Sequence, residues 1–238
     1  MAPVLELYRR KNRYLSRRLH HTFMKLLLIG VGPGIGLSVV RHFGRQGFEA
    51  LMVARSADKL AQMERDLAQE GIRSRGYACD IADEATFSAL MQRLAAEHAD
   101  LEVLHYNASA YNPAVPTAIS LPLFHSDFST NVVGALLAAQ AFVPAMRQRG
   151  RGTLFITGGG SALRAPAELA SLSIGKAGVR NLTYCLAEEC APYGIRVGTV
   201  TICGAVQPDT KYDPNRIAEI FWQMYQTPQD AWRWEIVL

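Results

Sequence analysis

Short apolar runs alternate with amphipathic segments along the chain from residue 24 to the end. The segments between the runs carry apolar residues at helical spacing, and glycine or polar residues separate the two kinds of segment. We therefore predict strands over residues 25–30, 49–54, 74–80, 101–107, 152–157, 194–202 and 234–238. Helices are predicted between them over residues 34–46, 57–70, 83–98, 123–149, 167–192 and 214–227.

Strands that are separated by helices favour right-handed crossovers and a parallel sheet. The pattern predicts a doubly wound α/β fold of the Rossmann type, with a mostly parallel seven-stranded sheet and helices on both faces. The chain has 238 residues and shows no internal repeat or low-complexity linker. We expect a single domain over residues 24–238, preceded by a basic N-terminal extension over residues 1–23.

This extension carries the positive charge of the chain, which is +4 overall. Residues 1–23 hold six Arg or Lys and one Glu, so the rest of the chain holds 19 basic and 20 acidic side chains. A nearly neutral body argues against a nucleic-acid partner. The extension is consistent with a segment that has no fixed structure, or with a start codon upstream of the domain, which visibly begins at Met24. The alternatives are a nucleic-acid arm, a membrane-surface helix or a transit peptide.

The composition narrows the class of protein further. Hydrophobic residues make up 49% of the chain and charged residues 19%, which is typical of a globular protein. No uninterrupted apolar run approaches the ~18 residues that span a bilayer. The four cysteines form no CxxC pair and no histidines have metal-ligand spacing, so no metal site is predicted. We expect a cytoplasmic protein with reduced cysteines and no membrane partner.

A glycine-rich turn, GVGPGIG, follows the first predicted strand and opens the first predicted helix at residues 30–36. Gly30 allows a sharp turn, Gly34 allows the backbone to approach a pyrophosphate, and Gly36 allows the helix to pack on the strand. The helix N-terminus offers free N–H groups and a positive dipole to phosphates. We therefore predict a dinucleotide site that includes these glycines and Ile35.

The residue after the second predicted strand bears on which dinucleotide is bound. An acidic residue there would bind the ribose 2′-hydroxyl of NAD, but this chain has Arg55. A guanidinium suits the 2′-phosphate of NADP. The alternative is a surface arginine that pairs with Asp58. We predict NADP(H) as the cofactor, ahead of NAD(H).

These features and several further motifs resemble the short-chain dehydrogenase/reductase family over Lys25 to about Cys203. The glycine turn matches the family's cofactor turn. Further positions in register with family motifs are Asp80 and Ile81 in CDI, Asn107 and Ala108 in YNAS, Asn131 in STNVVGA and Lys176 in GKAG. The resemblance implies that the first four contact the cofactor, that Asn131 helps to hold a proton-relay water, and that Lys176 binds the nicotinamide ribose.

The chain departs from the family pattern at the two hydroxyls that handle the proton. The family's tyrosine lies four residues before the lysine, where this chain has Leu172, and its serine falls on Gly159. In the family the tyrosine donates a proton as hydride reaches a carbonyl. We therefore expect a divergent member whose proton donor is nonstandard. Candidates are Tyr111, Ser161, Ser173, or a water held by Asn131 and Lys176.

Two functional hypotheses from different classes follow. The first is an NADP(H)-dependent oxidoreductase that acts on a small carbonyl or alcohol substrate. The second is a catalytically silent NADPH-binding sensor or interaction protein, which the loss of both hydroxyls favours. A methyltransferase-like nucleotide fold is a third possibility, and Arg55 argues against it. The apolar helix at 123–149 and the lysine-bearing helix predict a homo-oligomer, either a dimer or a tetramer.

Overall fold

The computed structural model describes residues 23–238. The predicted basic extension lies, apart from Phe23, outside these residues. One parallel sheet of seven strands runs through the domain, as predicted, and its strand order is β3-β2-β1-β4-β5-β6-β7. The strands are β1 (Lys25–Ile29), β2 (Glu49–Ala54), β3 (Ser74–Ala78), β4 (Val103–Tyr106), β5 (Gly152–Gly159), β6 (Ile195–Ile202) and β7 (Glu235–Val237).

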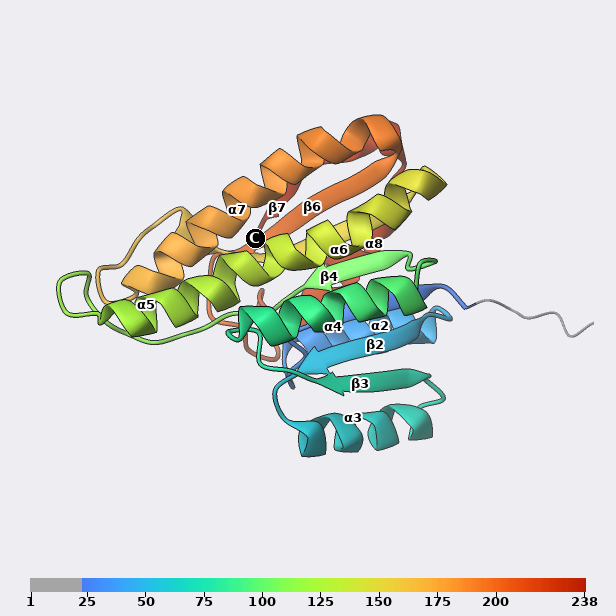
Figure 1. Ribbon diagram of the computed structural model, residues 1–238, viewed down its shortest axis with the longest axis horizontal. Helices are drawn as coiled ribbons and strands as arrows, with labels where there is room; N and C mark the ends of the chain where they lie inside the picture. Colours follow the sequence, from blue (N-terminus) through green and yellow to red (C-terminus); the bar gives the residue numbers. More distant parts are fainter. Residues whose placement is uncertain (1–22) are drawn as a thin grey trace, which may run out of the picture.

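Helices cover both faces of the sheet (Figure 1). They are α2 (Ile35–Arg45), α3 (Ala57–Gln69), α4 (Glu84–Glu97), α5 (Leu121–Phe128), α6 (Gly134–Arg149), α7 (Ala170–Cys190) and α8 (Pro214–Gln226). Side chains of α4, α6 and α7 form one hydrophobic core with the sheet, and those of α2, α3 and α8 form a second core on the opposite face. Successive β1 residues alternate between the two cores, because side chains along a strand point to opposite faces. The apolar runs of the sequence are therefore strands that are buried on both sides.

The local signals at the helix ends act as the sequence suggests. The side chain of Ser56 accepts a hydrogen bond from Lys59 N and begins α3, while Asp83 accepts one from Thr86 N and begins α4. Gly150 follows α6 with a φ of 66°, a left-handed conformation that favours glycine.

Two segments differ from the prediction. The glycines after residue 157 were expected to form a loop, but β5 continues through Gly158 and Gly159, which pair with Thr201 and Ile202 of β6. The long helix predicted over residues 123–149 is α5, a π-helical turn η1 (Ser129–Val133) and α6 in succession. The side chain of Asn131 lies in this π turn, which is a common feature of functional sites.

The stretch Leu121–Arg149 is also apolar enough, with a mean hydropathy of 1.4, and long enough to cross a membrane. Of its most apolar part, 44% is buried inside the protein, and Phe142 and Met146 are almost fully enclosed in the core. The high hydropathy is thus explained by packing on the sheet, and as evidence for a membrane span it is weak.

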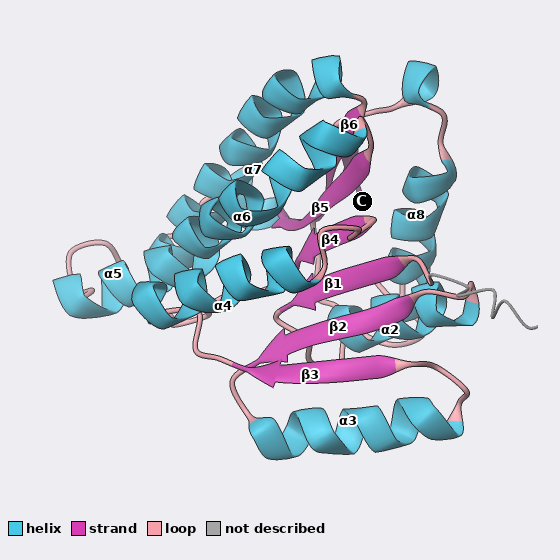
Figure 2. Cartoon of the chain, turned by 45° about the vertical axis from the view of Figure 1, so that its right-hand side comes forward, coloured by secondary structure: helices cyan, strands magenta, loops and turns pink. Residues whose placement is uncertain are grey.

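The topology determines where a ligand site lies. From β1 the chain moves outward to β2 and β3, and it then returns to place β4 on the other side of β1. The carboxyl ends of the strands point to one end of the sheet (Figure 2). In doubly wound folds a crevice opens beyond the strand ends at such a switch point. Here this is the place where the glycine turn after β1 faces the loop after β4.

Candidate active site

The turn at residues 30–36 depends on glycine at its two ends. Gly30 has a φ of +85°, and a Cβ there would lie 2.5 Å from the backbone of Ala108. A Cβ on Gly36 would lie 3.1 Å from Leu28 and Val31. Gly34 has nothing within 4 Å of its Cβ position, so its exposed side is open space. No side chain caps the N-terminus of α2 and no acid lies in its first turn, which leaves its amides available to an anion.

A buried network of polar side chains holds the glycine turn in place through Asn107. Asn107 Nδ2 donates to Gly30 O at 2.9 Å, and Asn107 Oδ1 accepts from Thr157 Oγ1 at 2.8 Å. Thr157 Oγ1 also lies 2.9 Å from His105 Nε2. Because the threonine proton is committed to Asn107, we assign the Nε2 proton to His105, which donates to Thr157. Burial lowers the pKa of His105 to about 3, so the imidazole is neutral and the network carries no charge.

Two connected cavities open at this end of the sheet. The larger has a volume of about 860 Å³ and includes the glycine turn, with Ile35, together with Gly159, Leu172 and Lys176 in its lining. The smaller, of about 460 Å³, includes Arg55, Asp80, Ile81 and Ala108. Gly30, Asn107, Ser109 and Tyr111 line both cavities. The structure therefore brings together every predicted cofactor-binding residue along one continuous crevice.

Arg55 lies at the end of β2 and is exposed. Among residues 23–238 no acidic group lies within ion-pair distance of its guanidinium, so the alternative pairing with Asp58 does not occur. Asp80 is also exposed on the wall of the same cavity, and its carboxylate accepts a hydrogen bond from Ala82 N. Arg55 thus presents a charge that the described chain does not neutralise.

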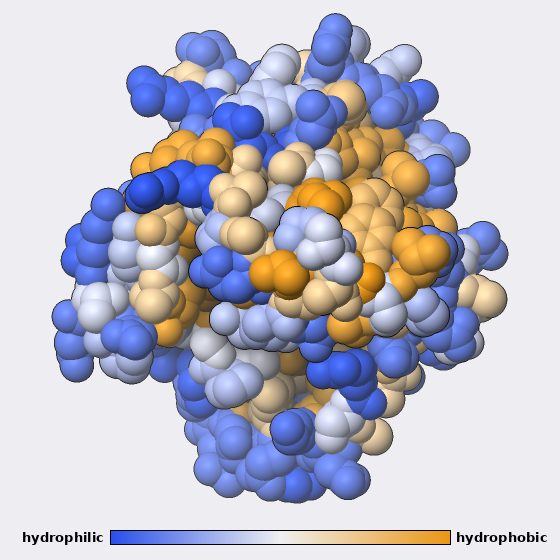
Figure 3. All heavy atoms as spheres, turned by 90° about the vertical axis from the view of Figure 1, so that its left-hand side faces the viewer, coloured by the Kyte–Doolittle hydropathy of each residue, from blue (hydrophilic) through white to orange (hydrophobic). Residues whose placement is uncertain are grey.

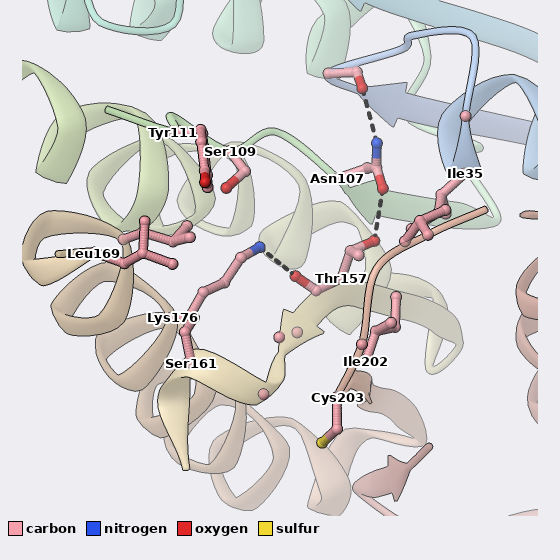
Figure 4. Close-up of a pocket in the computed structure, with 18 of the residues that line it drawn as sticks. Ile35, Asn107, Ser109, Tyr111, Thr157, Ser161, Leu169, Lys176, Ile202 and Cys203 are labelled. Carbon is pink, nitrogen blue, oxygen red and sulfur yellow. Dashed lines mark hydrogen bonds between the residues drawn. The ribbon is translucent and has the colours of Figure 1, made fainter. Parts of the chain in front are cut away.

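Lys176 is buried in α7, with only 8% of its surface exposed. Its Nζ donates to Thr157 O at 2.9 Å (Figure 4), and among residues 23–238 no carboxylate pairs with it. Burial without an anionic partner lowers its pKa to about 8. The ammonium has further N–H groups and lines the larger cavity, so it can donate to hydroxyl groups of a bound ligand.

The two positions where the family has proton-handling hydroxyls both face this lysine region. Gly159 lies at the end of β5, where a Cβ would make an ordinary contact of 3.5 Å with the stem of Lys176. Leu172 lies one helical turn before Lys176 and lines the same cavity. These two residues provide the cavity wall with apolar surface and no hydroxyl.

The loop after β4 forms the opposite wall. It contains Tyr111, which is 63% exposed and lines both cavities. Asn131 Oδ1 accepts from Ala110 N at 2.8 Å and from Ser109 Oγ at 3.2 Å. Asn131 lines neither cavity, so its amide holds the loop in place and does not face the crevice. In this geometry the side chain of Asn131 positions the loop, and the relay-water role that the resemblance implies stays a prediction.

A second buried residue, Asp127 of α5, holds the other side of Tyr111. Its carboxylate accepts from Asn112 Nδ2 at 2.6 Å and from Ser171 Oγ of α7 at 2.5 Å. The backbone continues the attachment, because Ala114 N donates to Glu168 O at 2.8 Å. The loop is thus fixed to the N-terminal end of α7 on one side and to η1 on the other.

The remaining serine candidates differ in position. Ser161 lines the larger cavity and also a small neighbouring cavity at the start of α7, whereas Ser173 is 4% exposed and lines only the small one. Sequence reasoning did not identify Ser109, Thr157 or Asp127. A signal existed for the last two, since Thr157 ends an apolar run and Asp127 is an acid within an apolar helix.

Comparisons with known proteins identify the family and the fold. A family model described as short chain dehydrogenase matches residues 25–216. D-threitol dehydrogenase of Mycolicibacterium smegmatis is 27% identical over 74% of this chain and 67% of its own length. The cis-4-hydroxycyclohexanecarboxylate dehydrogenase of Sinomonas cyclohexanicum is 30% identical over 73% of this chain and 70% of its own. The very-long-chain 3-oxoacyl-CoA reductase of Aspergillus clavatus is 30% identical over 73% of this chain, and the match spans 51% of the reductase's own length.

Solved structures resemble the whole fold. A metagenomic short-chain oxidoreductase in complex with NADP has a TM-score of 0.82 at 24% identity, covering 90% of this chain and 96% of that one. A short-chain dehydrogenase from Rhodopseudomonas palustris has a TM-score of 0.80 at 25% identity, covering 90% and 97%. The chain spans about half to two thirds of the length of the first curated relatives that it matches, whereas it spans nearly all of these structures.

Proposed function

We propose that this chain, which belongs to the short-chain dehydrogenase family, is an NADP(H)-dependent oxidoreductase that interconverts a carbonyl compound and its alcohol. One observation carries the proposal. Within the described part of the chain, a single crevice joins an uncapped glycine turn, an unpaired arginine at one end and a buried, unpaired lysine at the other. A turn that served packing alone would need neither of the two cations.

The residues fit a dinucleotide. Gly34 leaves open space for a pyrophosphate beside the free amides of α2, while Asp80 and Ile81 line the cavity at the adenine end. Lys176 would donate to the ribose hydroxyls at the nicotinamide end. A nicotinamide bound there supplies or accepts the hydride. The chain's own contribution is to orient this group, to exclude water and to supply a proton.

We assign NADP(H) rather than NAD(H) on the basis of Arg55. Its free guanidinium matches a 2′-phosphate, and the nearby exposed carboxylate, Asp80, lies after β3 and not after β2. Charge-assisted hydrogen bonds contribute about 1.5–3 kcal/mol each. Arg55→Asp is therefore expected to weaken NADPH binding about 10–100-fold and NADH binding much less. Fluorescence titration of both cofactors measures this, and equal losses would contradict the assignment.

We propose Tyr111 as the proton donor in place of the missing tyrosine. Its hydroxyl group belongs to a loop that is anchored on both sides, by Asn131 and by Asp127, so the side chain is presented to the crevice by a fixed backbone. In the reductive direction, Tyr111 Oη would give its proton to the carbonyl oxygen of the substrate. Because the side chain is largely exposed, the phenolate can recover a proton from solvent.

The first experiment is to titrate the purified protein with NADPH and NADH, and then to follow NADPH oxidation with aldehydes, ketones and quinones. Turnover with any of these supports the oxidoreductase. The second candidate, a silent NADPH-binding sensor, is favoured by Leu172 and Gly159 and predicts tight NADPH binding with no turnover on any substrate. Failure to bind either cofactor would contradict both functions.

We also propose a homo-oligomer that is joined through α6 and α7. The outer surfaces of these helices expose Leu136 by 38% and Ile174 by 47%, and a hollow of about 500 Å³ lies between them. In the proposed assembly, a second copy would cover these exposed apolar side chains. Light scattering of the purified chain measures the mass in solution, and a monomer at micromolar concentration would contradict this assembly.

A further inference from the structure

The part of the larger cavity beyond Lys176 is strongly apolar. Its walls are formed by Leu163, Pro166 and Leu169 from the segment between β5 and α7, by Leu172 from the first turn of α7, and by Val206 from the loop after β6. Leu163 and Val206 are 48% and 39% exposed at the mouth. Figure 3 shows the surface at this end of the sheet, where apolar side chains form one broad area and smaller separate areas among hydrophilic ones. Only a few hydroxyl groups interrupt this wall, chiefly those of Tyr111 and Ser161.

The charge of this cavity is of one sign. Within residues 23–238, Arg164 and Lys176 are the charged side chains of its lining, and this part of the chain contributes no carboxylate to it. Arg164 is exposed, and among residues 23–238 no acidic group lies within ion-pair distance of it, Glu168 included. If Lys176 serves the cofactor, Arg164 remains as the one cation in the lining that can serve a substrate.

An arginine beside an apolar wall selects a particular kind of molecule. The guanidinium binds a carboxylate in a bidentate arrangement, and low-dielectric walls strengthen its field within the cavity. Apolar substrate surface is stabilised when it is buried against the leucine side chains. A polyol would leave hydroxyl groups without partners on this wall, and a cation would be repelled by both charged residues.

We propose that the substrate is an apolar carbonyl compound, or the matching alcohol, that carries a carboxylate, with Arg164 binding the carboxylate and the leucines enclosing the apolar body. This inference rests on the proposed function, since it assumes that the glycine turn and Lys176 hold the cofactor. It assigns to Arg164 a role in substrate specificity that is separate from hydride and proton transfer.

The test is a calorimetric titration of the protein saturated with NADP⁺. The probes are para-acetylbenzoate, its neutral methyl ester, and dihydroxyacetone as a hydrophilic ketone. The aromatic acid is expected to bind about tenfold more tightly than its ester, and dihydroxyacetone more weakly than either. Arg164→Gln should remove the acid's advantage, weakening the acid about tenfold and leaving the ester unchanged. Arg65→Gln, an exposed arginine on α3 that lines neither cavity, is the charge-matched control and should change none of the three.

The outcomes separate this inference from the proposed function. If NADP⁺ itself does not bind, the proposed function fails before any probe is added. If NADP⁺ binds, three results would overturn the inference alone: no measurable binding of the aromatic pair, dihydroxyacetone binding as tightly as the acid, or Arg164→Gln weakening acid and ester equally. An unchanged thermal unfolding temperature in Arg164→Gln excludes a folding defect as the cause.

Discussion

The two ends of the crevice differ in whether backbone or side-chain atoms shape them. At the phosphate end, the turn over residues 30–36 is shaped by backbone: a left-handed Gly30, an open Gly34 and a closely packed Gly36. At the reaction end, around Gly159, Leu172 and Lys176, side chains form the wall and a Cβ on Gly159 would fit. The first end depends on glycine at fixed positions, and the second does not.

This difference separates anion binding, which depends on backbone amides, from proton transfer, which depends on a side-chain group. Anion binding at a helix N-terminus uses amides, which any sequence supplies once the glycines allow the turn. Proton transfer uses a hydroxyl or another titratable group at one position, so a single substitution removes it. A fold can therefore keep its cofactor crevice while its proton chemistry changes, which is why function has to be argued from the site.

The largest expected effect comes from removing the proposed proton donor. Tyr111→Phe should lower kcat by about 10²–10⁴ with NADPH affinity unchanged, because a positioned general acid contributes that much to the rate. Adding Leu172→Tyr and Gly159→Ser to this variant should restore part of the rate, since both hydroxyls would then face Lys176. The measurements are steady-state turnover and NADPH fluorescence titration. Turnover unaffected by Tyr111→Phe would transfer the role to Ser161 or to water.

A glycine substitution at each end tests the comparison directly. Gly30→Ala is expected to cost about 2–4 kcal/mol of unfolding free energy, because a Cβ would meet the Ala108 backbone in a left-handed conformation. Gly159→Ala, in extended backbone with a φ of −155°, should change stability by less than about 1 kcal/mol. Urea unfolding of the two variants gives both values. Equal costs would mean that the two ends do not differ in their dependence on glycine.

The smallest expected effect is a change in unfolding free energy that tests the role of Lys176. Its ammonium is buried without an anion, so Lys176→Met should stabilise the free protein by about 1–3 kcal/mol at pH 7 while it weakens NADP⁺ binding. Lys59→Met, at an exposed position on α3, should change unfolding by no more than about 0.5 kcal/mol. A loss of stability in Lys176→Met would mean that its bond to Thr157 outweighs the cost of burying the charge.

The same lysine predicts the sign of a pH effect. Its folded pKa, about 8, is depressed below the ordinary value of 10.5, so between these two values the unfolded chain binds the extra proton. Stability from this group therefore rises as pH increases through that window, and the advantage of Lys176→Met should narrow. Urea unfolding at pH 7 and near pH 10 measures the change. A constant difference at both pH values would contradict the depressed pKa.

Particular elements show how far sequence reasoning reached. The seven strands, the helix start at Asp83 and the helix end at Gly150 were predicted, because apolar runs, caps and glycines act within a few residues. The continuation of β5 through Gly158 and Gly159 was not, because the pairing with β6 that forms it joins residues about forty positions apart. The π turn at Asn131 was missed for the same reason, since its side chain is held by a loop twenty-one residues earlier.

The sequence by itself determined the sheet, the glycine turn, the basic residue after β2 and the family, since each depends on local spacing along the chain. Only the tertiary structure decided that Arg55 and Arg164 lack acidic partners within the described residues, that Lys176 is buried, that Asn131 and Asp127 anchor the loop of Tyr111, and that Ser173 faces a different cavity. Burial and pairing depend on which distant segments meet in space, and no local pattern encodes them.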